Sequence, residues 1–394
     1  MNVLVLNCGS SSLKFAVIDP DTPVEHVSGI AQRLGSPEAS LDVKRNGTKT
    51  SRPIPGALHD EALHGVVDVL KELGLADGLL AVGHRVVHGG SKFAGSMAIT
   101  PEVIAKVEEC IPLGPLHNPP NLVGIRIAQN LFPGLLQVGV FDTAFHQTMP
   151  PVAYTYPVPH EWLEKHGVRR YGFHGTSHRF VAREALRLAG LPADDHAIVT
   201  AHLGNGCSAA AVRNGRSVDT TMGLTPLEGL VMGTRCGSID PAIIGHVADA
   251  TGKGAKEILD VLNKKSGLLG VSGLSNDMRT VEEAAGNGNE RAKLALDIFC
   301  YVLAKTIAAL VVPLGRLDAL VFTGGIGENS TTVREMTLAR LGFLGLELDA
   351  AANAKHGRGQ NGRITTGTRP QALVVPTNEE LMIAEDAERI ARGA

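Results

Sequence analysis

The sequence lacks the cysteine pairs, the charge excess and the secretion signal that would assign it to several common classes of protein. Its five cysteines are scattered, odd in number and form no CxxC motif, which argues against a disulfide scaffold or a structural zinc site and suits a reducing cytoplasm. The formal net charge is only −3, which gives no electrostatic footprint for nucleic acid or a membrane surface. Charged or polar residues interrupt the apolar runs before they reach a membrane-spanning length. The first residues, MNVLVLNCGSSS, carry no basic n-region and are typical of a core strand rather than a signal peptide.

The chain is long enough for two domains, and its two halves begin alike. At 394 residues it exceeds the size at which one hydrophobic core usually stops growing. Residues 3–19 and 197–215 each consist of an apolar, β-branched run, a turn rich in Gly, Ser or Asn, and a second apolar run. These hairpins indicate an internal duplication, although any two hairpins would share the same pattern.

Strand and helix patterns alternate along the rest of the chain, which predicts an α/β architecture of two related domains, 1–150 and 151–378. The proline-rich stretch 149–159 is the expected hinge. Near the C-terminus, Thr377 and Glu380 are spaced as a capping box for the last helix, 379–394.

Reactive side chains follow several of the apolar runs, at the places where ligands bind in open α/β folds. They are Asn7, Arg85, Asp142, Asn205, the loop 323–329 and Glu379. Phosphoryl transfer requires such a set of groups. Acids hold a metal ion, cations interact with the charge of the transferred group, and glycine-rich turns bind phosphate.

Three glycine-rich turns are candidates for binding the phosphates of a nucleotide. They are NCGSSSLK (7–14), HLGNG (202–206) and GGIGEN (324–329), each of which follows an apolar strand. The sequence contains no GxxxxGK[ST], so a P-loop is excluded. One such turn is commonly an ordinary connection, but three in one chain favour phosphate.

Each candidate residue also has a purely structural interpretation. His174 and His178 in FHGTSH have a spacing that could bind zinc on a helix, but Gly175 separates them and no glutamate follows as in HExxH. Asp142 could be a turn acid, and Glu379 could serve only to favour its helix N-terminus.

The sequence is similar, over residues 7–380, to the motif series of the acetate kinases. The matching segments are, in order, NCGSSSLK, GHRVVHGG, GPLHNPPN, FDTAFH, YGFHGTSH, AHLGNG, LEGLVMGTRCGSIDP, SGLSNDMR, FTGGIGEN and PTNEE. The resemblance implies the fold of the actin, sugar kinase and Hsp70 superfamily, with two duplicated ribonuclease H-like domains flanking an ATP cleft. It further implies a homodimer and a last helix that packs back on the N-terminal domain.

The resemblance also implies a role for each matching residue. Asn7 and Glu379 would hold Mg²⁺, which Mn²⁺ could replace, with Asp142 nearby. Arg85 and Arg235 would clamp the carboxylate and the moving phosphoryl group, His174 would stabilise the transition state, and His117 would lie at the phosphoryl site. The acetyl methyl would be held by Val87, Leu116, Phe173 and Pro226. ATP or ADP would be contacted by Lys14, Ser10, Ser12, His202, Leu203, Gly204, Asn205, Gly206, Asp277, Met278, Arg279, Gly325, Ile326, Gly327, Glu328 and Asn329.

The implied reaction is the reversible conversion of ATP and acetate to ADP and acetyl phosphate. A carboxylate with a pKa of about 4 is already ionised at neutral pH, so we expect direct in-line attack without a general base. The alternatives are a propionate or butyrate kinase of the same superfamily, a non-catalytic ATP-binding scaffold of the Hsp70 type, and a zinc hydrolase built on FHGTSH.

Overall fold

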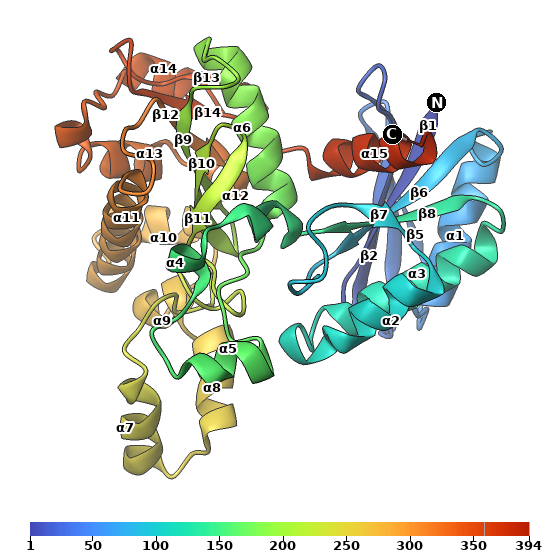
Figure 1. Cartoon of the computed structure of the whole chain (residues 1–394), viewed down its shortest axis with the longest axis horizontal. Coiled ribbons are helices and arrows are strands. Elements are labelled where there is room, and N and C mark those ends of the chain that lie inside the picture. The colour runs from blue at the N-terminus through green and yellow to red at the C-terminus, as the bar shows by residue number, and fades with distance from the viewer. Residues whose placement is uncertain (358, 394) are drawn as a thin grey trace. The chain divides into compact units, whose positions relative to one another are not determined.

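The computed structural model describes residues 1–357 and 359–393, and the chain divides into two compact units (Figure 1). The first unit comprises Met1–Gln147 and Asn378–Ala394, and the second comprises Thr148–Thr377. Each unit is built around one mixed β-sheet.

The first unit contains an eight-stranded sheet in the order β5-β4-β3-β2-β1-β6-β8-β7. Strands β1 and β2 form an antiparallel hairpin, whereas β1, β6 and β8 run parallel to one another. The strands are β1 (Asn2–Cys8), β2 (Ser12–Asp19), β3 (Val24–Gln32), β4 (Ser40–Arg45), β5 (Thr48–Pro53), β6 (Leu79–Val86), β7 (Met97–Ala98) and β8 (Leu136–Phe141).

Helices pack on both faces of this sheet. The helices are α1 (His59–Glu72), α2 (Pro101–Glu109), α3 (Asn118–Leu131) and α15 (Glu379–Ala391), with 3₁₀ turns at Ile111–Leu113 and Ala144–Thr148. Helices α1 and α3 cover the apolar face that includes Val82, while the neighbouring residue Gly83 faces α15. A Cβ atom on Gly83 would lie only 2.7 Å from Cγ2 of Ile383, so glycine permits α15 to pack closely on β6. This packing brings Glu379, the first residue of α15, to the sheet of the first unit.

The second unit repeats the central topology of the first. Its six-stranded sheet has the order β11-β10-β9-β12-β14-β13, with an antiparallel β9–β10 hairpin and parallel β9, β12 and β14. The strands are β9 (Ala197–Leu203), β10 (Cys207–Arg213), β11 (Arg216–Thr220), β12 (Ala319–Thr323), β13 (Gly362–Arg363) and β14 (Gln371–Val374). Each sheet thus begins with a hairpin whose first strand then pairs in parallel with later strands, which supports the predicted duplication.

In the second unit, α6 and α11 lie on either side of the sheet (Figure 1). The helices are α4 (Pro151–Tyr154), α5 (His160–His166), α6 (Gly175–Ala189), α7 (Ala242–Thr251), α8 (Ala255–Lys264), α9 (Gly267–Ser272), α10 (Met278–Gly286), α11 (Glu290–Val311), α12 (Gly324–Asn329), α13 (Thr331–Leu338) and α14 (Ala350–Lys355), with a 3₁₀ turn at Gly342–Leu344. The proline-rich stretch 149–159 contains α4 rather than only loop, and its role as a hinge stays a prediction.

Two local predictions were wrong. Helix α11 contains an 18-residue window with a mean hydropathy of 2.0, long and apolar enough to cross a membrane, although the apolar runs were expected to be too short. It packs on β9, β10, α9, α10 and α13, and this is the environment of a core helix. The predicted capping box at Thr377 is absent, because Asn378 caps α15 by accepting a hydrogen bond from the Leu381 amide. The Thr377 amide instead donates to Glu328.

Candidate functional site

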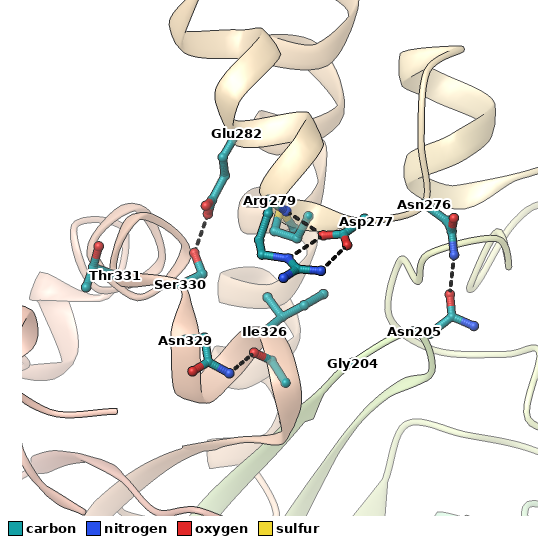
Figure 2. Close-up of a pocket in the computed structure, with 12 residues that line it drawn as sticks. Gly204, Asn205, Asn276, Asp277, Arg279, Glu282, Ile326, Asn329, Ser330 and Thr331 are labelled. Atoms are coloured by element: carbon teal, nitrogen blue, oxygen red, sulfur yellow. Dashed lines mark hydrogen bonds and ion pairs between the residues drawn. The ribbon is translucent and has the colours of Figure 1, made fainter. Parts of the chain in front are cut away.

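A cavity of about 830 Å³ opens in the second unit, within the size range of sites for nucleotide-sized ligands (Figure 2). Three parts of the chain line it: the turn between β9 and β10, the start of α10, and α12 with the residues that follow. The lining residues are Gly204, Asn205, Asn276, Asp277, Met278, Arg279, Glu282, Gly325, Ile326, Asn329, Ser330 and Thr331.

Hydrogen bonds between these segments hold the wall of the cavity in place. The Asn276 side-chain amide donates to the Asn205 side-chain oxygen at 3.1 Å (Figure 2). Asp277 caps α10 by accepting from the Arg279 amide at 2.9 Å, and its carboxylate also pairs with the Arg279 guanidinium at 2.6 Å. Because Arg279 is mostly exposed, this ion pair adds little stability, but it directs the guanidinium along the cavity rim.

Helix α12 is held in place by a half-buried carboxylate and a buried guanidinium. The Glu328 carboxylate accepts from the amides of Gly324 and Thr377, at 3.0 and 3.2 Å. The fully buried Arg334 guanidinium donates to the carbonyls of Gly327 and Glu328, at 2.9 and 2.8 Å. Gly324 has φ +76°, and a Cβ there would lie 2.7 Å from the Leu203 carbonyl, so only glycine fits this turn. The floor of the cavity is therefore held by hydrogen bonds from side chains that do not themselves line it.

Three histidines gather beside the β9–β10 turn in the second unit. His174 precedes α6 in the left-handed conformation, with φ +56°, which is uncommon for a residue other than glycine. Its ring stacks on that of His202, with centroids 4.3 Å apart, and lies 6.5 Å from that of His178. The His174 Nδ1 atom is 2.8 Å from the Ser208 hydroxyl.

Arg235 reaches the same turn as His174. A methyl group built on Gly206 would lie 3.1 Å from Nη2 of Arg235 and 3.6 Å from Nε2 of His174. The Arg235 Nη1 atom donates to the Pro226 carbonyl at 2.7 Å, and burial lowers the pKa of the guanidinium from its ordinary value. The partly buried guanidinium of Arg235 and a ring nitrogen of His174 thus lie beside the same glycine, and this arrangement suits the binding of an anion.

The first unit contains a buried cluster of an arginine and two acids. Arg85, near the end of β6, donates from Nε and Nη2 to the two oxygens of Asp142, which follows β8. Its Nε atom is also 3.8 Å from the Glu379 carboxylate. Burial works to lower the pKa of Arg85, but the charges of Asp142 and Glu379 outweigh it and raise that pKa. Burial raises the pKa of Glu379, opposed by the charge of Arg85.

The polar groups of this cluster fit a magnesium ion. Asn7 lies at the end of β1, opposite Lys14 in the hairpin, and the charge of Lys14 acts on Glu379. Amide and carboxylate oxygens from Asn7, Asp142 and Glu379 are the hard donors that Mg²⁺ prefers. Within residues 1–357 and 359–393, no group of three or more His, Cys, Asp or Glu side chains could hold a metal ion.

The chain is similar over nearly its whole length to known enzymes. The model of the acetokinase family matches residues 2–385. The chain belongs to the acetokinase family. An acetate kinase of Deinococcus radiodurans is 54% identical over 393 residues, covering 100% of this chain and 99% of the relative. An acetate kinase of Chromobacterium violaceum is 53% identical over 390 residues, covering 99% and 98%.

Solved structures give the same result for the fold. The crystal structure of an acetate kinase from Porphyromonas gingivalis has a TM-score of 0.94 at 47% identity and covers 99% of each chain. A propionate kinase from Francisella tularensis has the same TM-score at 43% identity, again with 99% coverage of each chain. The predicted fold class is confirmed, and this member of the acetokinase family is a kinase that phosphorylates a carboxylate.

The structure places eight of the sixteen predicted ATP residues in the cavity wall, five elsewhere in the second unit and three in the first unit. The wall residues are Gly204, Asn205, Asp277, Met278, Arg279, Gly325, Ile326 and Asn329. His202 stacks on His174, and Gly206 faces Arg235. Leu203 and Gly327 are buried, and the Glu328 side chain points into the protein.

The remaining predicted residues are divided between the two units. In the first unit, Ser10 and Lys14 are exposed around the β1–β2 turn with Ser12 half-buried, and His117 precedes α3. The predicted methyl pocket contributes Val87 and the exposed Leu116 to the first unit. It contributes Phe173, which is buried, and Pro226 to the second unit. Their joint role stays a prediction.

The zinc interpretation of FHGTSH does not agree with the geometry. His178 is buried, and its Nδ1 and Nε2 atoms lie 2.7 and 2.8 Å from the hydroxyls of Thr200 and Ser208. A metal ligand needs one ring nitrogen for the metal, whereas both nitrogens here are engaged by hydroxyls.

Sequence reasoning missed several residues of the site. Asn276, Glu282, Ser330 and Thr331 line the cavity, and Thr200 and Ser208 contact the histidines. Asn276 directly precedes the predicted segment 277–279, and Ser330 directly follows GGIGEN, so adjacency could have suggested them. Thr200 and Ser208 lie inside apolar strand patterns, where no local signal distinguishes them from core residues.

Proposed function

We propose that the protein catalyses the reversible, Mg²⁺-dependent transfer of the terminal phosphoryl group of ATP to acetate by direct in-line attack. The observation that carries this proposal is the buried Arg85–Asp142 pair, joined by two hydrogen bonds and flanked by Glu379. A pair of this kind fixes a guanidinium at a strand end, where its remaining N–H groups can meet an anion.

The proposed mechanism follows from the charges of the reactants. Acetate arrives ionised, so the barrier lies in bringing a carboxylate close to a polyphosphate rather than in removing a proton. Arg85 in the first unit and Arg235 in the second each supply a partly buried guanidinium, which can bridge two anionic oxygens at once. His174 supplies a further polar group beside Arg235. We assign most of the catalysis to these side chains.

The cavity in the second unit supports the proposed ATP site. Ile326 offers an apolar surface for a base, and Asn205, Asp277 and Arg279 offer polar contacts. Asn7 and Glu379 would hold Mg²⁺, with Asp142 positioning both the metal and Arg85. The bound metal would supply charge neutralisation of the phosphates and bind oxygens of the transferred group.

Acetate is proposed over propionate because the pocket predicted from the resemblance is formed by Val87 and three other apolar residues, and it matches the pocket that holds an acetyl methyl group. Similarity to both acetate and propionate kinases makes this preference a matter for measurement. By the same resemblance we propose a cytoplasmic homodimer with domains 1–150, completed by the last helix, and 151–378.

The proposal is tested by supplying ATP and Mg²⁺ with acetate, propionate or butyrate and trapping the acyl phosphate with hydroxylamine. We expect acyl hydroxamate to form with acetate, and we expect acetate to have the highest kcat/KM of the three carboxylates. A higher kcat/KM for propionate would reassign the substrate within the family. No hydroxamate from any of the three carboxylates, with ATP binding intact, would contradict the proposed function.

A further inference from the structure

A chain of hydrogen bonds runs from the proposed catalytic histidine into the interior of the second unit. The Nδ1 atom of His174 contacts the Ser208 hydroxyl at 2.8 Å, and the same hydroxyl contacts Nε2 of His178 at 2.8 Å. The Nδ1 atom of His178 contacts the Thr200 hydroxyl at 2.7 Å. Thr200 in turn donates to the backbone carbonyl of Ala210 at 3.5 Å.

The last member of this chain gives it a direction. A backbone carbonyl only accepts, so a Thr200 hydroxyl that donates to Ala210, over the long distance of 3.5 Å, leaves its oxygen to accept from Nδ1–H of His178. A neutral imidazole has one donor and one acceptor, so Nε2 of His178 then accepts from the Ser208 hydroxyl. Ser208 has no second hydrogen and must accept from Nδ1–H of His174. Each step follows from the one before it.

We propose that Thr200, His178 and Ser208 are positioning residues that keep a proton on Nδ1 of His174. Nε2, which faces Gly206 and Arg235, is then the nitrogen that gains or loses a proton. This proposal rests on the proposed function, in which His174 contacts the transferred phosphoryl group. With Nδ1 always protonated, His174 can donate from Nε2 only as an imidazolium, which adds a positive charge where negative charge develops.

The three residues that form this series of hydrogen bonds are shielded from solvent. Thr200, Ser208 and His178 each have 0% exposed surface, so their polar atoms have no water to exchange with. The hydroxyl residues come from neighbouring strands, Thr200 from β9 and Ser208 from β10, and His178 comes from α6. The strand pairing of Thr200 with Ala210 places the accepting carbonyl next to the Thr200 hydroxyl.

The test compares two substitutions of one buried hydroxyl. Thr200→Ser keeps the hydroxyl and loses a methyl group, whereas Thr200→Val keeps the shape and loses the hydroxyl. Histidine-labelled protein is studied by long-range ¹H–¹⁵N NMR, which distinguishes a protonated from an unprotonated ring nitrogen. The His174 signals are assigned as those that disappear in His174→Gln. Ser208→Ala serves as a second break in the chain, in case Thr200→Val fails to fold.

We expect the signals of wild type and Thr200→Ser to show His174 protonated at Nδ1 at every pH. Thr200→Val and Ser208→Ala should show a mixture of tautomers. They should lower kcat by roughly tenfold, about the value of one net hydrogen bond, while the KM for ATP is unchanged. A neutral His174 protonated at Nε2 in wild type, or the same His174 tautomer in Thr200→Val and Ser208→Ala as in wild type, would overturn the proposal. The NMR measurement of the tautomer does not depend on catalytic activity. A His174→Gln variant of normal kcat would therefore remove the catalytic role of His174 without affecting the tautomer result.

Discussion

The Arg85 guanidinium holds the Asp142 carboxylate by two hydrogen bonds, Nε to Oδ1 at 3.0 Å and Nη2 to Oδ2 at 2.7 Å. Asp142 is almost fully buried, and Arg85 is one-fifth exposed. The pair therefore orients a cation whose other donors remain available for a substrate anion.

Asp142→Asn removes the charge that orients Arg85 but preserves the size of the side chain. We expect kcat to fall about 10²–10³-fold, the scale for loss of transition-state electrostatics, with the fold retained. Steady-state kinetics measures kcat, and thermal unfolding of the same preparation shows whether the fold is retained. Asp77→Asn, at an exposed acid of the same unit, is the matched control and should leave kcat unchanged. Near-normal turnover in Asp142→Asn would show that the pair is structural.

Val87→Ala should shift substrate preference toward propionate. Removing two methyl groups makes room for an extra methylene of the substrate, worth at most roughly 1–3 kcal/mol in the ratio of kcat/KM values. Val123→Ala, at a half-exposed position on α3, makes the same chemical change away from the predicted pocket. An equal propionate-to-acetate ratio in both variants would remove Val87 from the substrate pocket.

Ile326→Trp should fill part of the cavity in the second unit. We expect the KM for ATP to rise at least tenfold and the KM for acetate to stay within twofold, because only the nucleotide meets this wall. Val24→Trp, on β3 of the first unit, is the control for adding a large apolar side chain. Should nucleotide affinity survive in Ile326→Trp, ATP must bind elsewhere.

His84 should make the first unit sensitive to acid. Burial lowers its pKa from 6.5 to about 4, and its Nε2 atom contacts the Gln137 side chain at 2.7 Å. Because the unfolded chain takes up this proton at higher pH than the folded one, stability is fully present above pH 6.5 and falls as the pH drops toward 4. Between pH 7 and pH 5, protonation of His84 in the unfolded chain is expected to lower the free energy of unfolding by about 2 kcal/mol. Urea unfolding at both pH values measures it, and His84→Gln should lose correspondingly less. Equal losses in the two proteins would assign the acid sensitivity to other groups.

Arg334→Met should destabilise the second unit and disturb the cavity floor. The substitution keeps the apolar stem but leaves the carbonyls of Gly327 and Glu328 without their donor, along with those of Asn353 and His356. We expect a loss of about 3 kcal/mol in the free energy of unfolding and a raised KM for ATP. Arg340→Met, at a half-exposed arginine after α13, is the control. A loss of stability with unchanged KM for ATP would show that the support of α12 by Arg334 does not contribute to nucleotide binding.

The sequence predicted the elements with clear periodicity and the polar residues at their ends. The strands β6 and β8 and the helices α6 and α11 lie where the apolar patterns place them, because each pattern is local. The cap of α15 was misassigned by one residue, since Thr377 has a good spacing but its amide is taken by Glu328, which is distant in sequence.

The supporting residues could not be predicted, because their roles arise only from tertiary contacts. Thr200 and Ser208 read as ordinary strand residues until α6 brings His178 against them. Arg334 reads as an exposed helical arginine, yet it is fully buried beneath α12. The residues proposed to contact ligand directly follow strands or lie in turns, so local sequence patterns reveal them. The residues that support them acquire their contacts only when helices and strands distant in sequence pack together.

The stereochemical course of transfer tests direct in-line attack most directly. ATP made chiral at the γ-phosphorus with oxygen isotopes is turned over with acetate and Mg²⁺, and the configuration of the acetyl phosphate is determined. A single displacement predicts inversion at phosphorus. Retention would contradict the account, because it requires an even number of displacements and hence a covalent phosphoenzyme, for example on Asp142 or Glu379.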